Sequence, residues 1–279
     1  MTKRACVIGW PIEHSRSPAI HGHWLKTYAI DGTYTKEAVR PENVRAFLAA
    51  LADRGLGGCN VTLPHKHAAL AAADHKDASA IAIGAANTLW LDAGKLCASN
   101  TDAYGFMTHL AQSAPGWDRI DAPVAILGAG GAARAIVHGF LEAGVGEIHL
   151  FNRTPARAQE LARHYGRRVR VFPWSQKEAR SRAAGVLVNT TSLGMVYGDP
   201  LDMDVAALRE DAVVADIVYV PLQTELLARA RARTARRRWP GHAAVSSRAR
   251  LREMVRRQAR GDARAARARR CRHRGPLMC

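Results

Sequence analysis

The sequence predicts an α/β protein made of two units, an N-terminal α/β domain followed by a doubly wound parallel sheet. Two observations carry this prediction. From Tyr104 onward, short apolar runs alternate with helical patterns of roughly 10–15 residues, which is typical of strands and crossover helices in a parallel sheet. Before that point, strands, helices and a hairpin follow one another in mixed order, and there is no internal repeat.

The first hundred residues contain apolar runs that are bounded by turn residues. We expect a short buried strand to end at Gly9, and a second strand to be stopped by Pro64. A segment that begins with Pro41 has apolar residues at helical spacing. In order, the expected elements are a strand at 4–9, helices at 18–28 and 41–54, a strand at 57–63, a helix at 65–73 and a hairpin at 88–96.

The second part of the chain shows the regular strand–helix alternation. The expected elements are a helix at 104–113, a strand at 123–127, an Ala-rich helix at 132–143, a strand at 147–151, a helix at 154–165 and strands at 168–172, 185–188 and 212–218. Beyond Arg233 the apolar periodicity mostly disappears, so no further element is predicted.

Charge is distributed unevenly along the 279 residues. The formal net charge is +17 and the sequence pI is about 10.5, which by itself would suggest a nucleic-acid-binding protein. Residues 231–279, however, contain 17 arginines, no lysine and two acids, a charge of +15 that leaves +2 for residues 1–230. The sequence therefore describes a nearly neutral protein with a strongly basic tail, and the two parts need separate explanations.

Composition excludes several classes of protein. No run approaches the roughly 18 apolar residues that a membrane-spanning helix requires, so no membrane protein is expected. Residues 1–10 lack the apolar core of a secretory signal. The five cysteines form no CxxC pair, which argues against a disulfide framework or a zinc site and is typical of a reducing cytoplasm. The twelve histidines show no metal-ligand spacing, so no metal is expected.

A glycine cluster stands between the expected strand at 123–127 and the expected helix at 132–143. It consists of Gly128, Ala129, Gly130 and Gly131, followed by the small residue Ala132. Glycines at such a position allow a tight turn and let backbone N–H groups approach a pyrophosphate at the helix N-terminus. A plain turn is the alternative. The strand–turn–helix setting favours a dinucleotide site in a Rossmann domain.

The end of the next strand carries a cluster of polar and basic residues. Asn152, Arg153 and Thr154 follow that strand, Arg157 lies one turn into the next helix, and no carboxylate precedes Glu160. A NAD-selective site usually has an acid here for the ribose 2′-hydroxyl, whereas Arg accommodates the 2′-phosphate of NADP. Helix capping by Thr154 with solvated arginines is the alternative. The pattern favours NADP.

Two polar clusters in the N-terminal half serve no evident purpose in a core. Ser15 and Ser17 stand at alternate positions just before a helix, where two hydroxyls can face a polyol or a carboxylate. Capping of the helix by Ser17 is the alternative. Thr62 and Lys66 flank a strand end, and a Lys there can donate a proton to a carbonyl that is being reduced. The alternative is that Lys66 is a solvated surface charge, as a lone Lys usually is.

Further polar residues follow at Asn87, Thr101 and Asp102. An Asp close to Lys66 would orient the ammonium group and keep it charged. The spacing along the sequence does not by itself show whether these residues lie close to Lys66 in the fold.

The chain resembles shikimate dehydrogenases over roughly Cys6 to Leu227. Each motif is weak by itself, but their order along the chain makes them specific together. The segments that carry the resemblance are Gly9–Pro18 (GWPIEHSRSP), Asn60–Lys66 (NVTLPHK), Gly84–Thr88 (GAANT), Asn100–Asp102 (NTD), Gly128–Gly131 (GAGG), Asn152–Thr154 (NRT), Asn189–Met195 (NTTSLGM) and Asp216–Tyr219 (DIVY).

The resemblance implies a substrate domain at 1–103, a Rossmann NADP-binding domain at 104–238, and reversible NADPH-dependent reduction of 3-dehydroshikimate to shikimate in aromatic amino-acid biosynthesis. Lys66 and Asp102 would be the catalytic pair. The residues expected to hold the small-molecule substrate are Ser15, Ser17, Thr62, Asn87 and Tyr219. Those expected to hold NADP(H) are Gly128, Ala129, Gly130, Gly131, Ala132, Asn152, Arg153, Thr154, Arg157, Thr190, Ser192 and Met195.

Two other functions stay open. One is a quinate/shikimate dehydrogenase that uses NAD, against which Arg153 and Arg157 argue. The other, from a different class, is nucleic-acid binding through the basic tail, although the tail lacks interleaved aromatic residues beyond Trp239. The oligomeric state considered is a homodimer.

Residues 239–279 depart from the family pattern. After Leu227 the family continues to a DGxxML…QA segment and closing helices, and neither appears here. The codons for Trp239 to Ser247, read one base later, permit Gly-Leu-Gly-Met-Leu followed by Leu-Tyr-Gln-Ala, the missing motif. We therefore expect a reading-frame shift between about Arg233 and Trp239, with weak stability and low activity of the chain as written. A genuine basic appendage is the alternative.

Overall fold

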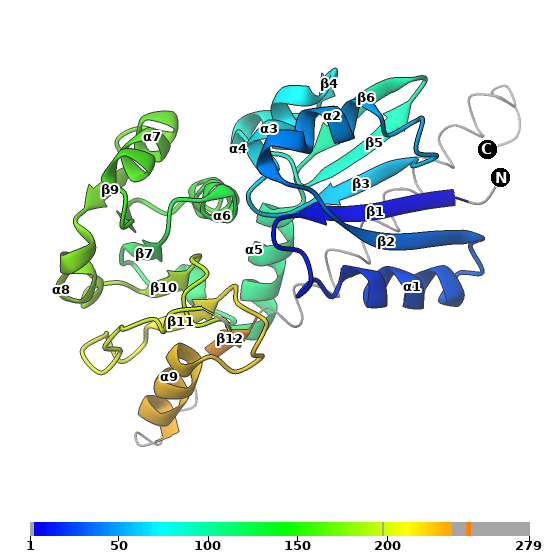
Figure 1. Ribbon diagram of the computed structural model, residues 1–279. Helices are drawn as coiled ribbons and strands as arrows, with labels where there is room; N and C mark the ends of the chain where they lie inside the picture. Colours follow the sequence, from blue (N-terminus) through cyan, green and yellow to red (C-terminus); the bar gives the residue numbers. More distant parts are fainter. Residues whose placement is uncertain (1–2, 197, 236–243, 247–279) are drawn as a thin grey trace, which may run out of the picture.

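The computed structural model describes residues 3–196, 198–235 and 244–246, which form two lobes with a six-stranded sheet in each (Figure 1). The first lobe contains β1 (Lys3–Gly9), α1 (Ser17–Thr27), β2 (Gly32–Ala38), a 3-10 turn η1 (Pro41–Asn43), α2 (Val44–Ala49), β3 (Gly58–Val61), α3 (Lys66–Ala72), β4 (His75–Lys76), α4 (Ala78–Ile83), β5 (Thr88–Asp92) and β6 (Lys95–Ser99).

The second lobe contains α5 (Asp102–Ser113), η2 (Trp117–Arg119), β7 (Val124–Leu127), α6 (Gly131–Glu142), β8 (Ile148–Phe151), α7 (Pro155–Tyr165), β9 (Val169–Phe172), η3 (Trp174–Gln176), α8 (Lys177–Ser181), β10 (Val186–Asn189), β11 (Val213–Asp216), α9 (Glu225–Ala235) and β12 (Ala244–Ser246).

The first sheet has the strand order β2-β1-β3-β5-β6-β4. β1 pairs in parallel with β2 and β3, whereas β5 is antiparallel to both β3 and β6. Because β5 runs against its neighbours, its first residue lies at the same edge as the last residues of β1, β3 and β6. Four separate chain segments therefore meet at this edge.

The second sheet is parallel throughout, with the order β12-β11-β10-β7-β8-β9. Counted from β7, this is the order 6-5-4-1-2-3 of a Rossmann domain, in which the winding reverses between β7 and β10. Strands such as Val124–Leu127 are buried along their whole length, as expected where helices cover both faces of a sheet. The prediction of a doubly wound α/β domain is confirmed.

The structure differs from the sequence prediction in several elements. The helix expected at 41–54 is shorter, because Pro41–Asn43 form a 3-10 turn and the α-helix ends at Ala49. β2 is an additional strand at the edge of the sheet, and its sequence GTYTKEA has no buried residue that would mark it. Four more elements were not predicted, because the first three are short and the last is rich in arginine: β4, α4, α8 and α9.

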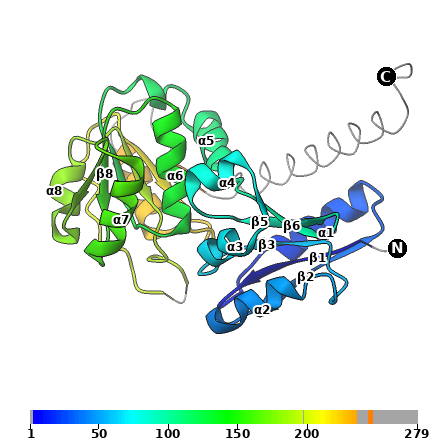
Figure 2. The same ribbon diagram turned by 90° about the horizontal axis from the view of Figure 1, so that it is seen from above.

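Helix α5 connects the two lobes. It begins at Asp102 at the edge of the first sheet and runs into the second lobe, where Phe106 packs edge-on against Phe140 of α6 at 5.8 Å between ring centroids. A small apolar cluster also joins the lobes and consists of Ile83, Ala85, Ala103 and Ala135. Figure 2 shows α4 beside α6 along this seam.

Most of the arginine-rich segment at 239–279 lies outside the described residues. The expected reading-frame shift and the expected loss of closing helices concern that segment, so they too fall outside the described residues. The described part of that segment is β12, which pairs in parallel with β11 in the register Val214 to Ala244. No helix within the described ranges is long and apolar enough to cross a membrane.

Candidate active site

The polar residues predicted for the first lobe meet at one edge of its sheet. They come from four segments, with Ser15 and Ser17 after β1, Thr62 after β3, Asn87 before β5 and Asp102 after β6. Backbone hydrogen bonds tie the segments together: the N–H of Thr62 donates to the carbonyl of Ile8 at 2.9 Å, and that of Asn87 to Ser99 at 3.1 Å. The sheet topology thus gathers residues that are up to 87 positions apart.

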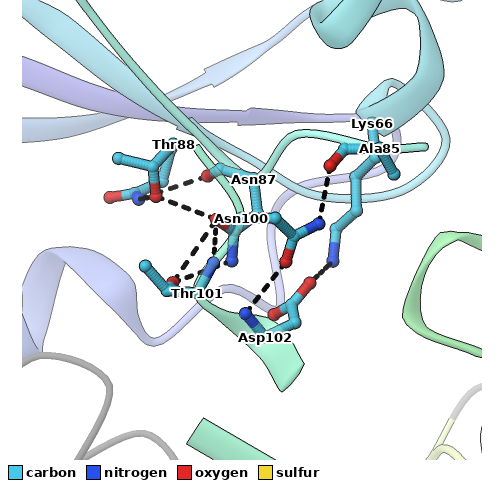
Figure 3. Close-up of polar contacts among 8 residues, drawn as sticks. Lys66, Ala85, Asn87, Thr88, Asn100, Thr101 and Asp102 are labelled. Carbon is cyan, nitrogen blue, oxygen red and sulfur yellow. Dashed lines mark hydrogen bonds and ion pairs between the residues drawn. The ribbon is translucent and has the colours of Figure 1, made fainter. Parts of the chain in front are cut away.

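Lys66 and Asp102 form an ion pair at this edge (Figure 3). Nζ of Lys66 lies 2.5 Å from Oδ2 of Asp102, and the two side chains are 13% and 6% exposed. Lys66 is the first residue of α3 and Asp102 is the first residue of α5. The lysine is therefore not a solvated surface charge. Because water is largely excluded, the attraction between the two charges is stronger than it would be on the surface.

Asn100 holds the backbone of Asp102 in place (Figure 3). Its Oδ1 accepts the N–H of Asp102 at 2.9 Å, and its Nδ2 donates to the carbonyl of Ala85 at 2.8 Å. Both ends of this buried amide are used, so it fixes the turn from β6 into α5. No role is predicted for Asn100 from the sequence. The available signal was an Asn two residues before a helix start, where its side chain commonly bonds the backbone.

Asn87 is the centre of a second network in the same figure. Its Oδ1 accepts the hydroxyl of Thr88 at 2.9 Å and the N–H of Thr101 at 3.1 Å, and its Nδ2 donates to Oγ1 of Thr101 at 3.1 Å. Asn60, which the sequence analysis did not single out, donates to Oγ1 of Thr88 at 3.2 Å and accepts the hydroxyl of Tyr34 at 2.7 Å. This row of amides and hydroxyls is suited to a ligand with several hydroxyl groups.

Ser15 lies in the segment that leads from β1 into α1, and Ser17 is the first residue of α1. Oγ of Ser15 accepts the N–H of Ser17 at 3.3 Å. Arg16 occupies the cap position of α1 and makes no side-chain cap bond, so the proposed capping by Ser17 is wrong. Burial raises the pKa of Tyr34 well above its ordinary value, and hydrogen bonding to Ser17 offsets part of that rise. Ser17 therefore lies next to the Asn60–Asn87 network.

The glycine-rich loop follows β7 and leads into α6. Gly128 has a φ of +105°, and a Cβ there would lie 2.6 Å from Oγ1 of Thr190, so the turn requires glycine. The N–H of Ala129 donates to Oδ1 of Asn152 at 3.2 Å. A Cβ on Gly130 would meet no atom of the described residues within 4 Å. The loop is therefore open to a ligand at the N-terminus of α6, where an anion is favoured.

Basic and polar residues stand at the end of β8. Arg153, Thr154 and Arg157 are exposed, and Asn152 is half-buried. Thr154 occupies the cap position of α7 as the alternative expects, but its side chain makes no cap hydrogen bond. The first carboxylate that follows, Glu160, forms an ion pair with Arg134 of α6. This edge therefore presents positive charge to an incoming ligand.

The loops after β10 and β11 carry the remaining predicted residues. The hydroxyl of Thr190 donates to the carbonyl of Leu127 at 2.6 Å, which places Thr190 beside the start of the glycine-rich loop. Ser192 is exposed, Met195 is half-buried, and Tyr219 is half-buried in the loop after β11. All four lie past the carboxyl ends of parallel strands, where ligands bind in open α/β sheets.

The two lobes meet at the ion pair. A Cβ on Gly131 would lie 3.1 Å from Cδ of Lys66, so the glycine-rich loop packs against the lysine side chain. The predicted catalytic pair and the predicted cofactor loop therefore adjoin. Within residues 3–196, 198–235 and 244–246, no three His, Cys, Asp or Glu side chains are grouped so that they could hold a metal ion.

A Rossmann sheet joined to a second α/β lobe, with a shielded Lys–Asp pair between them, defines the class of two-domain dinucleotide-binding dehydrogenases. Residues 7–89 match the shikimate dehydrogenase substrate binding domain, and residues 109–217 match the shikimate / quinate 5-dehydrogenase family. The chain belongs to the shikimate dehydrogenase family.

Relatives and solved structures agree with this assignment. The chain is 52% identical to shikimate dehydrogenase (NADP(+)) of Brucella canis over 231 residues, which cover 82% of this chain and 80% of the relative. It is 54% identical to that of Afipia carboxidovorans over 232 residues, or 83% of each chain. Shikimate 5-dehydrogenase of Thermus thermophilus, solved with NADP(H) and shikimate, has 35% identity and a TM-score of 0.76, covering 90% of this chain and 89% of that one.

Proposed function

We propose that this chain catalyses the NADP-dependent, reversible reduction of 3-dehydroshikimate to shikimate, a step in aromatic amino-acid biosynthesis. The observation that carries the proposal is the shielded Lys66–Asp102 pair, 2.5 Å apart, against which the glycine-rich loop packs. This arrangement sets a proton donor beside the loop that would hold a redox cofactor. Family membership supports the same reaction.

Lys66 and Asp102 would act as the catalytic pair. The chemistry that NADP(H) supplies when bound is transfer of a hydride to or from the C3 carbon of the substrate. The ammonium of Lys66 donates a hydrogen bond to the C3 oxygen and passes a proton to it as the carbonyl becomes an alcohol. Asp102 orients the ammonium through the ion pair. In the reverse direction Lys66 takes the proton back.

The substrate would be held by the row of hydroxyls and amides at the edge of the first sheet. Ser15 and Ser17 would bind its carboxylate from the segment that leads into α1. Thr62, Asn87 and Tyr219 would bind the ring hydroxyls. The fixed hydrogen bonds of Asn87 to Thr88 and Thr101 support this role, because they set the direction of the amide before a ligand arrives.

The residues of the second lobe fit NADP(H). The open backbone at Gly130 and the N-terminus of α6 suit a pyrophosphate. The exposed guanidinium groups of Arg153 and Arg157 suit the 2′-phosphate. The full set that would hold the cofactor is Gly128, Ala129, Gly130, Gly131, Ala132, Asn152, Arg153, Thr154, Arg157, Thr190, Ser192 and Met195.

Several wider features belong to the same proposal. The chain would divide into a substrate domain at 1–103 and an NADP-binding domain at 104–238, act in the cytoplasm on a small molecule, and form a homodimer. Sedimentation of the purified chain at several concentrations tests the homodimer, because a monomer mass throughout would exclude it.

The experiment that tests the reaction is an assay of purified chain with shikimate or quinate, each with NADP+ or NAD+, followed by absorbance of the reduced cofactor. We expect shikimate with NADP+ to be the best combination. Quinate dehydrogenase of Corynebacterium glutamicum, solved with NAD, has a TM-score of 0.76 and 28% identity to this chain over 89% of each. A preference for quinate with NAD+ would therefore place the chain in that branch and overturn the proposal.

A further inference from the structure

We propose that Asp216 is a positioning residue that holds the loops after β10 and β11 in their ligand-binding geometry. The inference rests on the proposed function, because those loops carry Thr190 and Met195, assigned to NADP(H), and Tyr219, assigned to the substrate. Asp216 itself would touch neither ligand. It acts through hydrogen bonds to residues of both loops.

Asp216 is the last residue of β11 and is 3% exposed. Its Oδ1 accepts Nδ2 of Asn189 at 3.0 Å and the N–H of Val218 at 2.9 Å, and its Oδ2 accepts the hydroxyl of Thr224 at 2.7 Å. Three donors thus converge on one buried carboxyl group. Each donor belongs to a different segment: the end of β10, the loop after β11, and the start of α9.

Asn189 transmits this anchoring to the first loop. Its Nδ2 also donates to the carbonyl of Leu193 at 3.1 Å, and its Oδ1 accepts both the N–H and the hydroxyl of Thr191, at 3.0 and 2.7 Å. The amide therefore closes the turn that begins at Thr190. The bond that this amide donates to Asp216 helps to set its orientation.

Thr224 transmits the anchoring to the second loop. Its Oγ1 accepts the N–H of Leu227 at 3.3 Å, so the residue that bonds Asp216 also caps α9. The two loops are joined directly as well, by the N–H of Val196 and the carbonyl of Val220 at 3.1 Å. Both ends of the segment that carries Tyr219 are therefore tied to the carboxyl group of Asp216.

A pocket of about 190 Å³ places this cluster next to a predicted ligand contact. It lies between the first loop and the start of α9, and its walls include Gly194, Met195, Asp216 and Thr224. Asp216 and Met195 therefore line the same pocket, so the hydrogen bonds of Asp216 lie close to the wall that Met195 forms.

Loss of these bonds leaves buried polar groups without one of their hydrogen-bond partners, a cost that the loops can reduce by moving. A ligand that binds the moved loops must first order them again, which weakens its binding. A positioning role therefore predicts that loss of these bonds weakens NADP+ binding and also speeds hydrogen exchange in the two loops. A merely structural role predicts a lower melting temperature, with ligand binding unchanged in the folded protein.

The test compares Thr224→Val, Thr224→Ser and Asp216→Asn in the full chain, with Asp202→Asn as the control at an exposed acid. Thr224→Val removes the hydroxyl at nearly constant shape, whereas Thr224→Ser retains it. The readouts are the dissociation constant of NADP+ by calorimetry and the hydrogen exchange of residues 190–196 and 217–224.

We expect Thr224→Val and Asp216→Asn to raise the dissociation constant about five- to tenfold, the size of one hydrogen bond, and to speed exchange in both loops. Thr224→Ser stays closer to the wild type, and the control is unchanged. Dissociation constants within twofold of the wild type for both Thr224→Val and Asp216→Asn would overturn the inference.

Failure of the proposed function gives a different result. If the wild-type chain binds NADP+ but does not oxidise shikimate, the proposed reaction fails and the binding data still decide the inference. If the wild-type chain binds no NADP+, the hydrogen-exchange data decide the inference. Faster exchange in both loops of Thr224→Val and Asp216→Asn supports the inference, and unchanged exchange overturns it.

Discussion

Gly131 of the glycine-rich loop lies against the side chain of Lys66, since a Cβ on this glycine would be 3.1 Å from Cδ and 3.3 Å from Cβ of the lysine. The glycine belongs to the second lobe and the lysine to the first. The position of the Lys66 ammonium therefore depends on how the lobes pack, and on its ion pair with Asp102 at the start of α5.

Gly131→Ala tests this packing. The added methyl group requires Lys66 to shift by a few tenths of an ångström, and small misplacement of a reacting group is costly, so we expect kcat to fall roughly tenfold. Stability should hold, because Gly131 is the first residue of α6 and has no positive φ, so Ala can adopt its backbone conformation. Gly146→Ala is the control, at an exposed glycine with no described atom within 4 Å of a Cβ. An unchanged kcat in Gly131→Ala would contradict the prediction.

Lys66→Met tests the assignment of the proton donor. Loss of a general acid lowers kcat by about 10²- to 10⁴-fold, and here it also removes the buried ion pair with Asp102, which lowers the melting temperature. The rate is measured well below that temperature, so that only folded enzyme contributes. Lys95→Met, at an exposed lysine of β6, serves as the control. A variant that keeps most of its kcat would remove Lys66 from the reaction.

Arg153→Ala and Arg157→Ala test cofactor selectivity. A charge-assisted hydrogen bond to the 2′-phosphate is lost in each, so we expect kcat/KM for NADPH to fall about tenfold per variant. The value for NADH should hardly change, because NADH lacks that phosphate. Arg163→Ala, at an exposed arginine of the same helix, is the control. Equal losses with both cofactors would mean that these arginines do not read the 2′-phosphate.

Asp216 makes a pH-dependent contribution to stability. Burial raises the pKa of its carboxyl group from 3.8 to about 6, although hydrogen bonds from Val218, Thr224 and Asn189 lower it in part. A carboxyl group whose pKa is raised by folding stabilises the protein below its unfolded pKa, and this contribution is lost as the pH rises through about 6.

We therefore expect the free energy of unfolding of the wild type, relative to Asp216→Asn, to fall by about 2 kcal/mol between pH 4 and pH 7. Urea titrations of both proteins at each pH measure the difference. A difference that is constant across this range, or that grows with pH, would show that burial does not raise the pKa of the Asp216 carboxyl group.

The basic tail is tested by restoring the reading frame. We expect the chain as written to be less stable and less active than a chain whose frame is restored between about 233 and 239, because apolar surface left uncovered costs about 25 cal/mol per Å². Thermal unfolding and shikimate oxidation of the two proteins measure this. Equal stability and activity would instead favour a genuine appendage.

A DNA-binding titration tests the remaining alternative for the tail. Nucleic-acid binding through the arginines would show a steep dependence on salt and would disappear when residues 231–279 are removed. Weak binding that survives this removal would exclude the tail as its source.

Much of the fold could be predicted because it depends on local patterns. Val124–Leu127 is an apolar run followed by glycine, and it forms a buried strand that ends in a turn at Gly128. β2 escapes prediction because edge strands need no buried face. The helix at 41–54 is overestimated because apolar spacing continues past the point where the chain turns toward Gly55.

The candidate site was only partly predictable, because local patterns do not show which distant residues come into contact. Lys66 and Asp102 stand in recognisable motifs, but nothing local indicates that they form an ion pair. Asn60 and Asn100 are polar residues beside those motifs, and they are used as internal scaffolding through contacts with Tyr34 and Ala85 that lie 26 and 15 positions away. A lone Asn in a loop carries no sign of such a partner.

The sequence by itself determined the buried strands, the glycine turn and the separation of a nearly neutral body from a basic tail, since each depends on residues adjacent in the chain. Only the tertiary structure decided that Lys66 meets Asp102 and that Asp216 ties two loops together. The reason is physical: these contacts depend on strand order and on the antiparallel course of β5, which arise from packing of the whole chain and not from any local pattern.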